Sequence, residues 1–344
     1  MNDSKTLEDQ IKYMWNNIKG FHVIHFIYTG YELDLFNTIE KSGKYGLSAK
    51  ELSVQKTINL YYIEKWCLSG VAWNILIEEA NKYKLAPHME YILNRPGDPR
   101  YLLPYVKSCI DHFGPDMKNH STYYANGKKY TFQDHGIDFS KDIGNITEGL
   151  QTLLTHKILP NISSLNDLFS NKCKVLDFGC GTAKLLIKLS DKYPNCDYFG
   201  MDIDDSGIKL GRKDILSLNK EKNITLINSN EDKLPENSSI DIVTMVEVLH
   251  EIDKNIRQDI IINISKLIKK GGFIVILDET MPEKDQIKED KYTLSILTQY
   301  NEMTWGNEVP TENEQNKLLT NAGFEIADRK IIGGLFTLLI AKKL

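Results

Sequence analysis

The sequence is 344 residues long, a length that favours two domains rather than one. Hydrophobic residues make up 41% of it and charged residues 26%, which is ordinary usage for a globular protein with its own buried core. The formal net charge of −5 argues against a nucleic-acid partner, because such partners select a basic surface.

The N-terminal residues MNDSKTLEDQ are polar and acidic, so they do not resemble a signal peptide. The chain contains no uninterrupted run of about eighteen apolar residues, and we therefore expect no transmembrane helix and no membrane partner. Its five cysteines include no C-x-x-C pair, a pattern typical of reduced thiols rather than of a disulfide framework or a zinc site. These features together predict a cytoplasmic protein.

Residues 1–90 predict a mainly helical domain. Apolar and aromatic residues recur at helical spacing over 21–39. Ser48 and Glu51 fit a capping box, in which each side chain binds the other residue's backbone amide at the start of a helix. A longer helix is expected over 60–77, followed by a polar turn and a short strand. This order of elements is typical of a winged helix.

Residues 91–171 predict a helical linker and the lid of a pocket, interrupted by several prolines. The aromatic stretch 130–136 within it could close over a cofactor. We expect His135 in this stretch to be a solvated loop residue.

In residues 172–344, strands alternate with helices. Strands are expected at 173–178, 197–201, 224–228, 240–246 and 272–277, and helices at 183–192, 206–218, 254–269 and 312–322. Such alternation predicts an α/β fold with a doubly wound, mostly parallel sheet. Two final strands around Gly333 and Gly334 predict an antiparallel hairpin, which makes the sheet seven-stranded.

The run VLDFGCGT, residues 175–182, predicts a ligand site where the first of these strands ends. Gly179 and Gly181 allow positive φ and a close approach of ligand to backbone. The third glycine of a dinucleotide-binding fingerprint is absent, since Lys184 occupies its position. Asp177 would repel a pyrophosphate, whereas it suits a cationic ligand that carries an amino group.

The next strand ends at Asp202, followed by Ile203. A carboxylate at this place can accept hydrogen bonds from both hydroxyls of a ribose. The alternative interpretation is purely structural, with turn glycines and an acid that caps a helix.

These runs resemble the motifs of class I S-adenosylmethionine-dependent methyltransferases. VLDFGCGT is similar to their first motif, Asp202 matches their ribose-binding acid, and residues 229–235 are similar to the segment that frames the adenine. Asn230 stands where many members carry aspartate, with Glu231 and Asp232 as neighbouring candidates. The resemblance continues through 267–272 and 318–324. It implies S-adenosyl-L-methionine as cofactor, bound by Asp177, Gly179, Gly181, Asp202, Ile203, Asn230, Glu231 and Glu247.

The segment 245–253 resembles the L-H-D motif of small-molecule O-methyltransferases, in which the histidine is a general base. His250 falls on that histidine and Glu251 replaces the aspartate. Asp278 falls where that family holds an acid that orients the histidine, and Glu279 is adjacent. The resemblance therefore implies methyl transfer to an oxygen nucleophile, with His250, Asp278 and Glu251 as catalytic residues.

Other interpretations of His250 stay open. It could cap a helix, or it could position the acceptor of a C- or N-methyltransferase. It could also bind a metal together with Glu251 or Asp278. We assign no metal ligand, because a single histidine without H-x-H or H-x-x-x-H spacing is a weak metal signal.

The resemblance also predicts the partners. The insertion 300–311 forms part of the acceptor pocket in O-methyltransferases, so Tyr300, Met303 and Trp305 are expected to contact a small-molecule acceptor of secondary metabolism. The N-terminal domain is expected to form a homodimer. A DNA-binding regulator that senses S-adenosylmethionine is the alternative, and the acidic composition argues against it.

Overall fold

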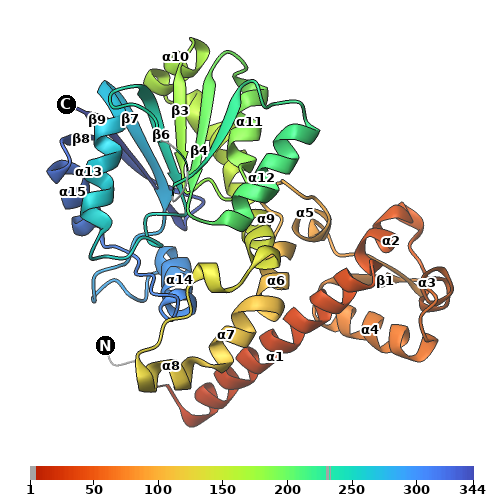
Figure 1. The fold of residues 1–344 in the computed structure, drawn as a ribbon. Helices are drawn as coiled ribbons and strands as arrows, with labels where there is room; N and C mark the ends of the chain where they lie inside the picture. Colours follow the sequence, from red (N-terminus) through yellow and green to blue (C-terminus); the bar gives the residue numbers. More distant parts are fainter. Residues whose placement is uncertain (1–4, 230–231, 233) are drawn as a thin grey trace. The chain divides into compact units, whose positions relative to one another are not determined.

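The computed structural model describes residues 5–229, 232 and 234–344 (Figure 1). The chain divides into two compact units, which meet between Pro115 and Asp116. The segment 91–171, which was expected to form a separate linker and lid, is shared between them. Its first part packs in the helical unit and its second part packs on the sheet unit, so the unit boundary lies inside the segment.

The first unit is helical with one small hairpin. Its elements are α1 (Leu7–Glu32), α2 (Leu35–Lys41), η1 (Gly43–Tyr45), α3 (Ala49–Lys56), α4 (Leu60–Ala72), β1 (Leu76–Glu79), β2 (Lys82–Leu85), α5 (Met89–Leu93), α6 (Leu103–Ser108) and η2 (Cys109–Phe113). Strands β1 and β2 pair antiparallel, as the wing of a winged helix does. The core includes Phe26, stacked on Trp66 with ring centroids 4.6 Å apart.

Two helix boundaries of this unit differ from the prediction. Helix α1 begins at Leu7, because Thr6 and Asp9 form a capping box that the apolar pattern does not reveal. Helix α4 ends at Ala72 rather than near 77, since Asn74 adopts a left-handed φ of 60° that no α-helix continues. The predicted capping box of α3 is confirmed, with the Glu51 amide donating to the Ser48 hydroxyl over 3.2 Å.

The second unit is a seven-stranded sheet with helices. Its elements are α7 (Gly114–Lys118), α8 (His120–Asn126), η3 (Phe132–Asp134), α9 (Ile137–Leu153), η4 (Leu154–Ile158), η5 (Leu159–Asn161), α10 (Ser163–Ser170), β3 (Lys174–Phe178), α11 (Lys184–Lys192), β4 (Asp197–Asp202), α12 (Asp205–Ser217), β5 (Ile224–Asn228), β6 (Ile240–Val246), α13 (Arg257–Leu267), β7 (Ile268–Asp278), η6 (Asp290–Tyr292), α14 (Thr293–Glu302), α15 (Glu312–Asn321), β8 (Phe324–Ile332) and β9 (Phe336–Lys343).

The strand order is β5-β4-β3-β6-β7-β9-β8, and β9 alone runs against its two neighbours. The predicted doubly wound, mostly parallel sheet with a terminal hairpin is therefore confirmed. The chain reverses its direction of travel across the sheet at β3, which has β4 on one side and β6 on the other. Open α/β sheets bind ligands at such a switch point.

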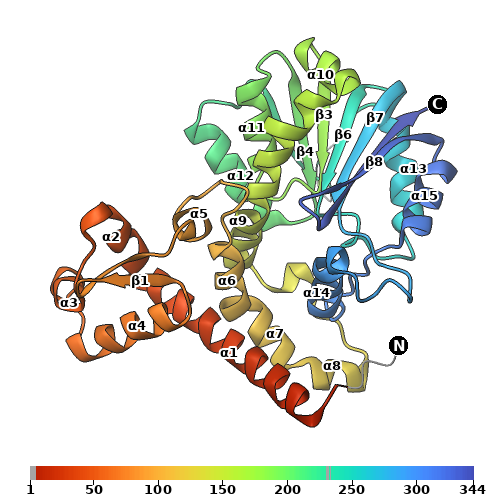
Figure 2. The same ribbon diagram turned by 180° about the vertical axis from the view of Figure 1, so that it is seen from behind.

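Helices cover both faces of this sheet (Figures 1 and 2). Successive strand residues point to opposite faces, so that Val175 and Ile242 pack with α10, α11 and α12, whereas Leu176 and Val243 pack with α13 and α15. Burial on both faces explains the continuous apolar runs of the strands. No helix within the described ranges is both long enough and apolar enough to cross a bilayer.

Candidate cofactor and acceptor site

A cavity of about 450 Å³ lies at the carboxyl ends of β3, β4 and β6. Its volume falls within the range of small-molecule sites. The residues predicted from sequence that line it are Gly179, Gly181, Asp202, Ile203, Glu247, Glu251 and Trp305. The sheet's switch point therefore holds the cavity, as the fold leads us to expect.

The turn after β3 forms one wall of the cavity. The amides of Gly179 and Cys180 both donate to the carbonyl of Met201, over 2.8 and 3.1 Å, and this ties the turn to the end of β4. Gly179 has a φ of +75°, and a Cβ there would lie 2.4 Å from a methyl carbon of Val248. Glycine is required at this position, because other residues rarely adopt this φ and because a side chain would clash with Val248.

Asp202 is fixed at the rim by the same turn. Its Oδ2 accepts a hydrogen bond from the Gly181 amide over 2.7 Å, and its Oδ1 accepts one from the Asp204 amide over 2.8 Å. Each carboxylate oxygen has a second lone pair, so two acceptor positions remain for a diol in the cavity. Burial raises the pKa of Asp202 above its ordinary value, which favours a ligand that donates hydrogen bonds to it.

Asp177 is placed differently from the prediction. It is not among the described residues that line the cavity, and its Oδ1 accepts a hydrogen bond from the Thr244 hydroxyl over 2.7 Å within the sheet. Burial raises the pKa of Asp177 to about 7. The carboxyl group is therefore bonded within the sheet and is not one of the groups that line the cavity.

The two predicted adenine contacts, Asn230 and Glu231, lie outside the described residues. Ile203 is half exposed and lines the cavity beside Asp202. An apolar side chain there can pack on the flat face of a base.

Glu247 brings a second carboxylate to the cavity from the end of β6. Its buried Oε1 has no hydrogen-bond partner within the described part of the chain. Burial, and then the neighbouring Glu279 and Asp278 carboxylates, raise the pKa of Glu247 well above its ordinary value. A buried carboxylate without a partner is costly, and a cationic ligand in the cavity would relieve that cost.

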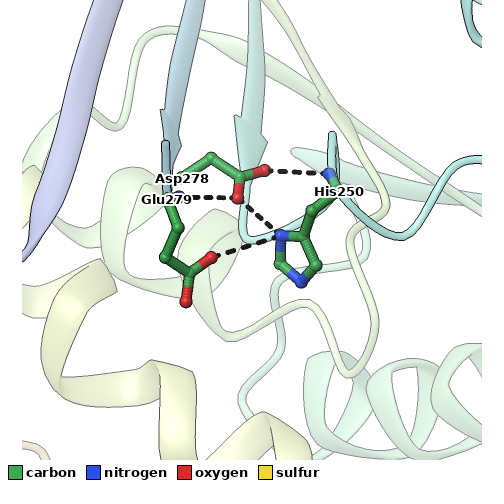
Figure 3. Close-up of side chains that lie close together, drawn as sticks. All are labelled: His250, Asp278 and Glu279. Carbon is green, nitrogen blue, oxygen red and sulfur yellow. Dashed lines mark hydrogen bonds and ion pairs between the residues drawn. The ribbon is translucent and has the colours of Figure 1, made fainter. Parts of the chain in front are cut away.

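His250 and Asp278 meet as predicted, on the loop after β6 and at the end of β7 (Figure 3). The imidazole Nδ1 lies 2.5 Å from Oδ1 of Asp278, and the Leu249 amide donates to Oδ2 over 2.7 Å. Oε2 of Glu279 lies 3.3 Å from the same Nδ1. These contacts hold the ring in one orientation and leave Nε2 facing away from the pair.

The second nitrogen of His250 lies near an acid that the sequence analysis did not single out. Oε2 of Glu302, at the end of α14, is 3.4 Å from Nε2. Burial would lower the pKa of His250, but the Asp278 and Glu279 carboxylates raise it well above its ordinary value. A chain separation of 52 residues between His250 and Glu302 explains why spacing gave no signal for this contact.

The predicted acceptor-pocket residues do not all lie in one place. Trp305 lines the main cavity, and its indole Nε1 donates to Asp116 over 2.9 Å. Met303 lines a second cavity next to α14, whereas Tyr300 is 51% exposed and is in neither described lining. Only Trp305 therefore reaches the cavity where the cofactor is expected.

His135 is not a solvated loop residue, contrary to the expectation. Its Nε2 lies 2.8 Å from Oδ2 of Asp116, and its ring stacks on Phe139 with centroids 4.0 Å apart. The hydrogen bond and the stacked ring remove it from water. Asp116 thus joins His135 to Trp305 beside the cavity.

Comparison with known proteins gives matches in sequence and in fold. Residues 176–274 match a family described as "Methyltransferase domain". A carboxy-S-adenosyl-L-methionine synthase from Campylobacter hominis is 23% identical over 186 residues, which are 50% of this chain and 78% of that protein. Since the matched region spans the G-x-G turn, Asp202 and His250, the family applies to the cavity just described. These matches support a class I S-adenosylmethionine-dependent methyltransferase domain in this part of the chain.

Solved structures of methyltransferases share this fold over the whole chain. An O-methyltransferase family protein from Burkholderia thailandensis superposes with a TM-score of 0.76 at 16% identity, covering 98% of both chains. Human N-acetylserotonin methyltransferase, solved in complex with SAM, superposes with a TM-score of 0.73 at 18% identity and covers 100% of this chain and 99% of its own. The helical first unit is therefore part of the fold that this chain shares with these solved structures.

Proposed function

We propose that this methyltransferase transfers the methyl group of S-adenosylmethionine to an oxygen atom of a small-molecule acceptor, with His250 as the general base. The observation that supports this most is the placement of His250 and its orienting acid Asp278 next to a cavity with the features of a nucleoside site. His250 is not itself among the described lining residues, but its neighbours Glu247 and Glu251 are.

The residues of the cavity fit the cofactor. Asp202 offers two acceptor positions for the ribose diol, and Ile203 offers an apolar surface to the base. Glu247 presents a buried, unpartnered oxygen, and the positively charged amino and sulfonium groups of the cofactor would pair with such a charge. When bound, the cofactor supplies an electrophilic methyl group on sulfur.

The chain's own residues align the acceptor and take its proton. In transfer to oxygen, the acceptor oxygen forms a bond to the methyl carbon, the S–CH₃ bond electrons stay on sulfur, and the acceptor proton must leave. Nδ1–H of His250 donates to Asp278, which makes Nε2 the atom that receives the proton. A cation bound in the cavity lowers the pKa of this imidazole and so favours the neutral form that a base requires.

The test replaces His250 and measures turnover with labelled methyl groups. A screen of phenols, carboxylic acids and 2-oxo acids first identifies an acceptor. His250→Ala is then expected to lower turnover by about 10²–10⁴-fold, the usual contribution of acid–base catalysis. His156→Ala, a change of the same kind elsewhere in this unit, should leave turnover unchanged. Turnover of His250→Ala within a few-fold of the parent would refute the base role, and transfer to carbon or nitrogen only would refute the oxygen acceptor.

We also propose that the chain forms a homodimer through its first unit. Helix α1 exposes a stripe of apolar side chains at spacings of three and four residues, namely Leu7, Ile11, Met14, Ile18 and Phe21, with Trp15 beside them. An exposed apolar stripe of this length on a soluble protein is typical of a protein–protein interface. A second copy is the partner that the resemblance to O-methyltransferases implies.

A further inference from the structure

We propose that Arg257, the first residue of α13, is a positioning residue for His250, and this inference rests on the proposed function. Its guanidinium binds the backbone of the segment that carries His250 and also the backbone of the segment that carries Trp305. Because Trp305 lines the cavity, Arg257 fixes the general base relative to one of the cavity walls.

Two segments that are far apart in the chain meet at this guanidinium. Nη2 of Arg257 donates to the Glu308 carbonyl over 2.7 Å, to the Ile252 carbonyl over 2.8 Å and, over a longer 3.4 Å, to the His250 carbonyl. Its Nε donates to the Ile252 carbonyl over 3.1 Å. The His250 carbonyl also accepts from the Glu308 amide over 3.1 Å. The two segments are therefore joined both directly and through Arg257.

The stability of α13 does not explain why an arginine is buried here. Arg257 is 4% exposed, and the hydrogen bonds of its side chain within the described ranges go to backbone carbonyls. Burial lowers the pKa of Arg257 below its ordinary value, although the Asp278 carboxylate acts in the opposite direction. A cation at the first position of a helix is also unfavourable to the helix dipole. What the buried charge supplies is a rigid fork of donors that spans two segments.

His250 is consequently held both at its ring and at its backbone. Asp278 binds Nδ1 and so orients the imidazole (Figure 3), whereas Arg257 and the Glu308 amide bind the carbonyl of the same residue. Without the guanidinium, Nε2 of His250 can move relative to the wall that Trp305 forms. A displacement of about 1 Å between reacting groups can lower a rate by about 10²-fold, so the expected effect is on the chemical step.

An exposed ion pair joins the same two segments and provides a matched control. Nζ of Lys254 lies 2.8 Å from Oε2 of Glu308, and these side chains are 61% and 44% exposed. Exposed ion pairs contribute little to stability. Lys254→Met removes this pair and leaves the contacts of Arg257 in place, so it should behave like the parent.

The experiment compares Arg257→Met, Arg257→Lys and Lys254→Met with the parent in the full-length chain. With the acceptor from the screen, Arg257→Met is expected to lower kcat by roughly 10–100-fold. Its affinity for S-adenosylhomocysteine should stay within a few-fold of the parent, because Arg257 is not among the described residues that line the cavity. Arg257→Lys should recover part of the lost turnover, since an ammonium group donates to carbonyls but lacks the fork of a guanidinium.

A second readout does not depend on turnover. In protein labelled with ¹⁵N-histidine, the Nδ1–H that His250 donates to Asp278 should give a downfield proton signal, which His250→Ala identifies by removing it. Arg257→Met should shift or broaden this signal, and Lys254→Met should leave it unchanged. A role of Arg257 in folding alone would lower the melting temperature without changing the signal of the folded molecules.

The outcomes separate the positioning role from the proposed function. The role is overturned if the His250 signal of Arg257→Met matches that of the parent, or if Lys254→Met lowers kcat as much as Arg257→Met does. A loss of S-adenosylhomocysteine affinity as large as the loss of kcat also overturns it, because the damage is then general. If Arg257→Met does not fold, Arg257→Lys carries the same tests. Turnover that survives His250→Ala refutes the proposed function, and the signal still decides whether Arg257 positions the ring.

Discussion

Buried carboxyl groups in and near the cavity indicate which kind of ligand the cavity binds. Asp202 and Glu247 reach the cavity directly, and Asp177 lies behind the wall. Burial raises the pKa of each of the three. Since a buried carboxylate is stabilised by a nearby positive charge, these residues favour a cationic nucleoside over a phosphate-bearing dinucleotide.

Asp177 should make the stability of the ligand-free chain depend on pH. Burial raises its pKa from 3.8 to about 7, so the folded chain holds this proton more tightly than the unfolded chain does. The tighter binding of this proton adds up to roughly 4 kcal/mol to the free energy of unfolding, and this contribution is complete below pH 3.8. It is lost as the pH rises from 3.8 through the folded-state pKa of about 7. Asp177→Asn removes this dependence, since an amide does not ionise.

Denaturant unfolding at pH 5 and pH 8 measures this effect. The stabilising effect of Asp177→Asn is expected to be larger at pH 8 than at pH 5 by roughly 2–3 kcal/mol. The exposed Asp167→Asn serves as control and should show no such difference. Equal effects of Asp177→Asn at both pH values would show that the buried carboxyl does not hold its proton.

At the scale of residues, a contact could be predicted from the sequence when both of its residues lie in a recognisable motif. His250 and Asp278 each follow a strand, so their meeting could be predicted from the parallel sheet. Glu302 could not, because it ends a helix in an insertion whose path no local pattern determines. The partners of Asp177 and His135 were likewise missed, since they depend on packing across the sheet and under the aromatic rings.

At the scale of elements, the turn between β3 and α11 positions both the cavity and the loop that carries His250. Gly179→Ala places a methyl group against Val248 and forces an unfavourable φ. We expect a lower melting temperature and at least a tenfold weaker affinity for S-adenosylhomocysteine, because the turn and the Val248 loop must separate.

Gly333→Ala, in the turn between β8 and β9, is the matched control. Its φ of +61° has a similar backbone cost, but within the described residues nothing lies within 4 Å of the added Cβ. This variant should lose stability and keep its affinity. If calorimetry gives the same affinity for Gly179→Ala and Gly333→Ala, the turn does not shape the cofactor site.

Element boundaries could be predicted where burial alone determines them. Strands β5 and β6 match the prediction to the residue, because most residues of each are apolar and are buried by the sheet. Helix α13 begins at Arg257 rather than at 254, since the Asp253 side chain binds the Asn255 amide and holds a turn there. Side-chain-to-backbone bonds of this kind compete with helix formation and leave little trace in hydrophobic spacing.

At the scale of the whole molecule, the exposed stripe of α1 predicts the oligomeric state. Multi-angle light scattering of the parent is expected to give twice the mass of one chain. Trp15→Glu combined with Ile18→Glu should give the single-chain mass, because charges replace apolar contacts at the interface. Val54→Glu, at another exposed apolar position of the same unit, should leave the dimer intact. A parent of single-chain mass would contradict the homodimer.

The most direct test of the central claim is calorimetry with S-adenosylhomocysteine and, in parallel, with NAD⁺. We predict that the parent binds one S-adenosylhomocysteine per chain and no NAD⁺. Asp202→Asn should weaken binding of S-adenosylhomocysteine by tenfold or more, since one hydrogen bond to a charged acceptor contributes roughly 1.5–3 kcal/mol. Absence of binding to S-adenosylhomocysteine, unchanged affinity in Asp202→Asn, or tight binding of NAD⁺ would contradict an adenosyl nucleoside whose ribose is held by Asp202 at the end of β4.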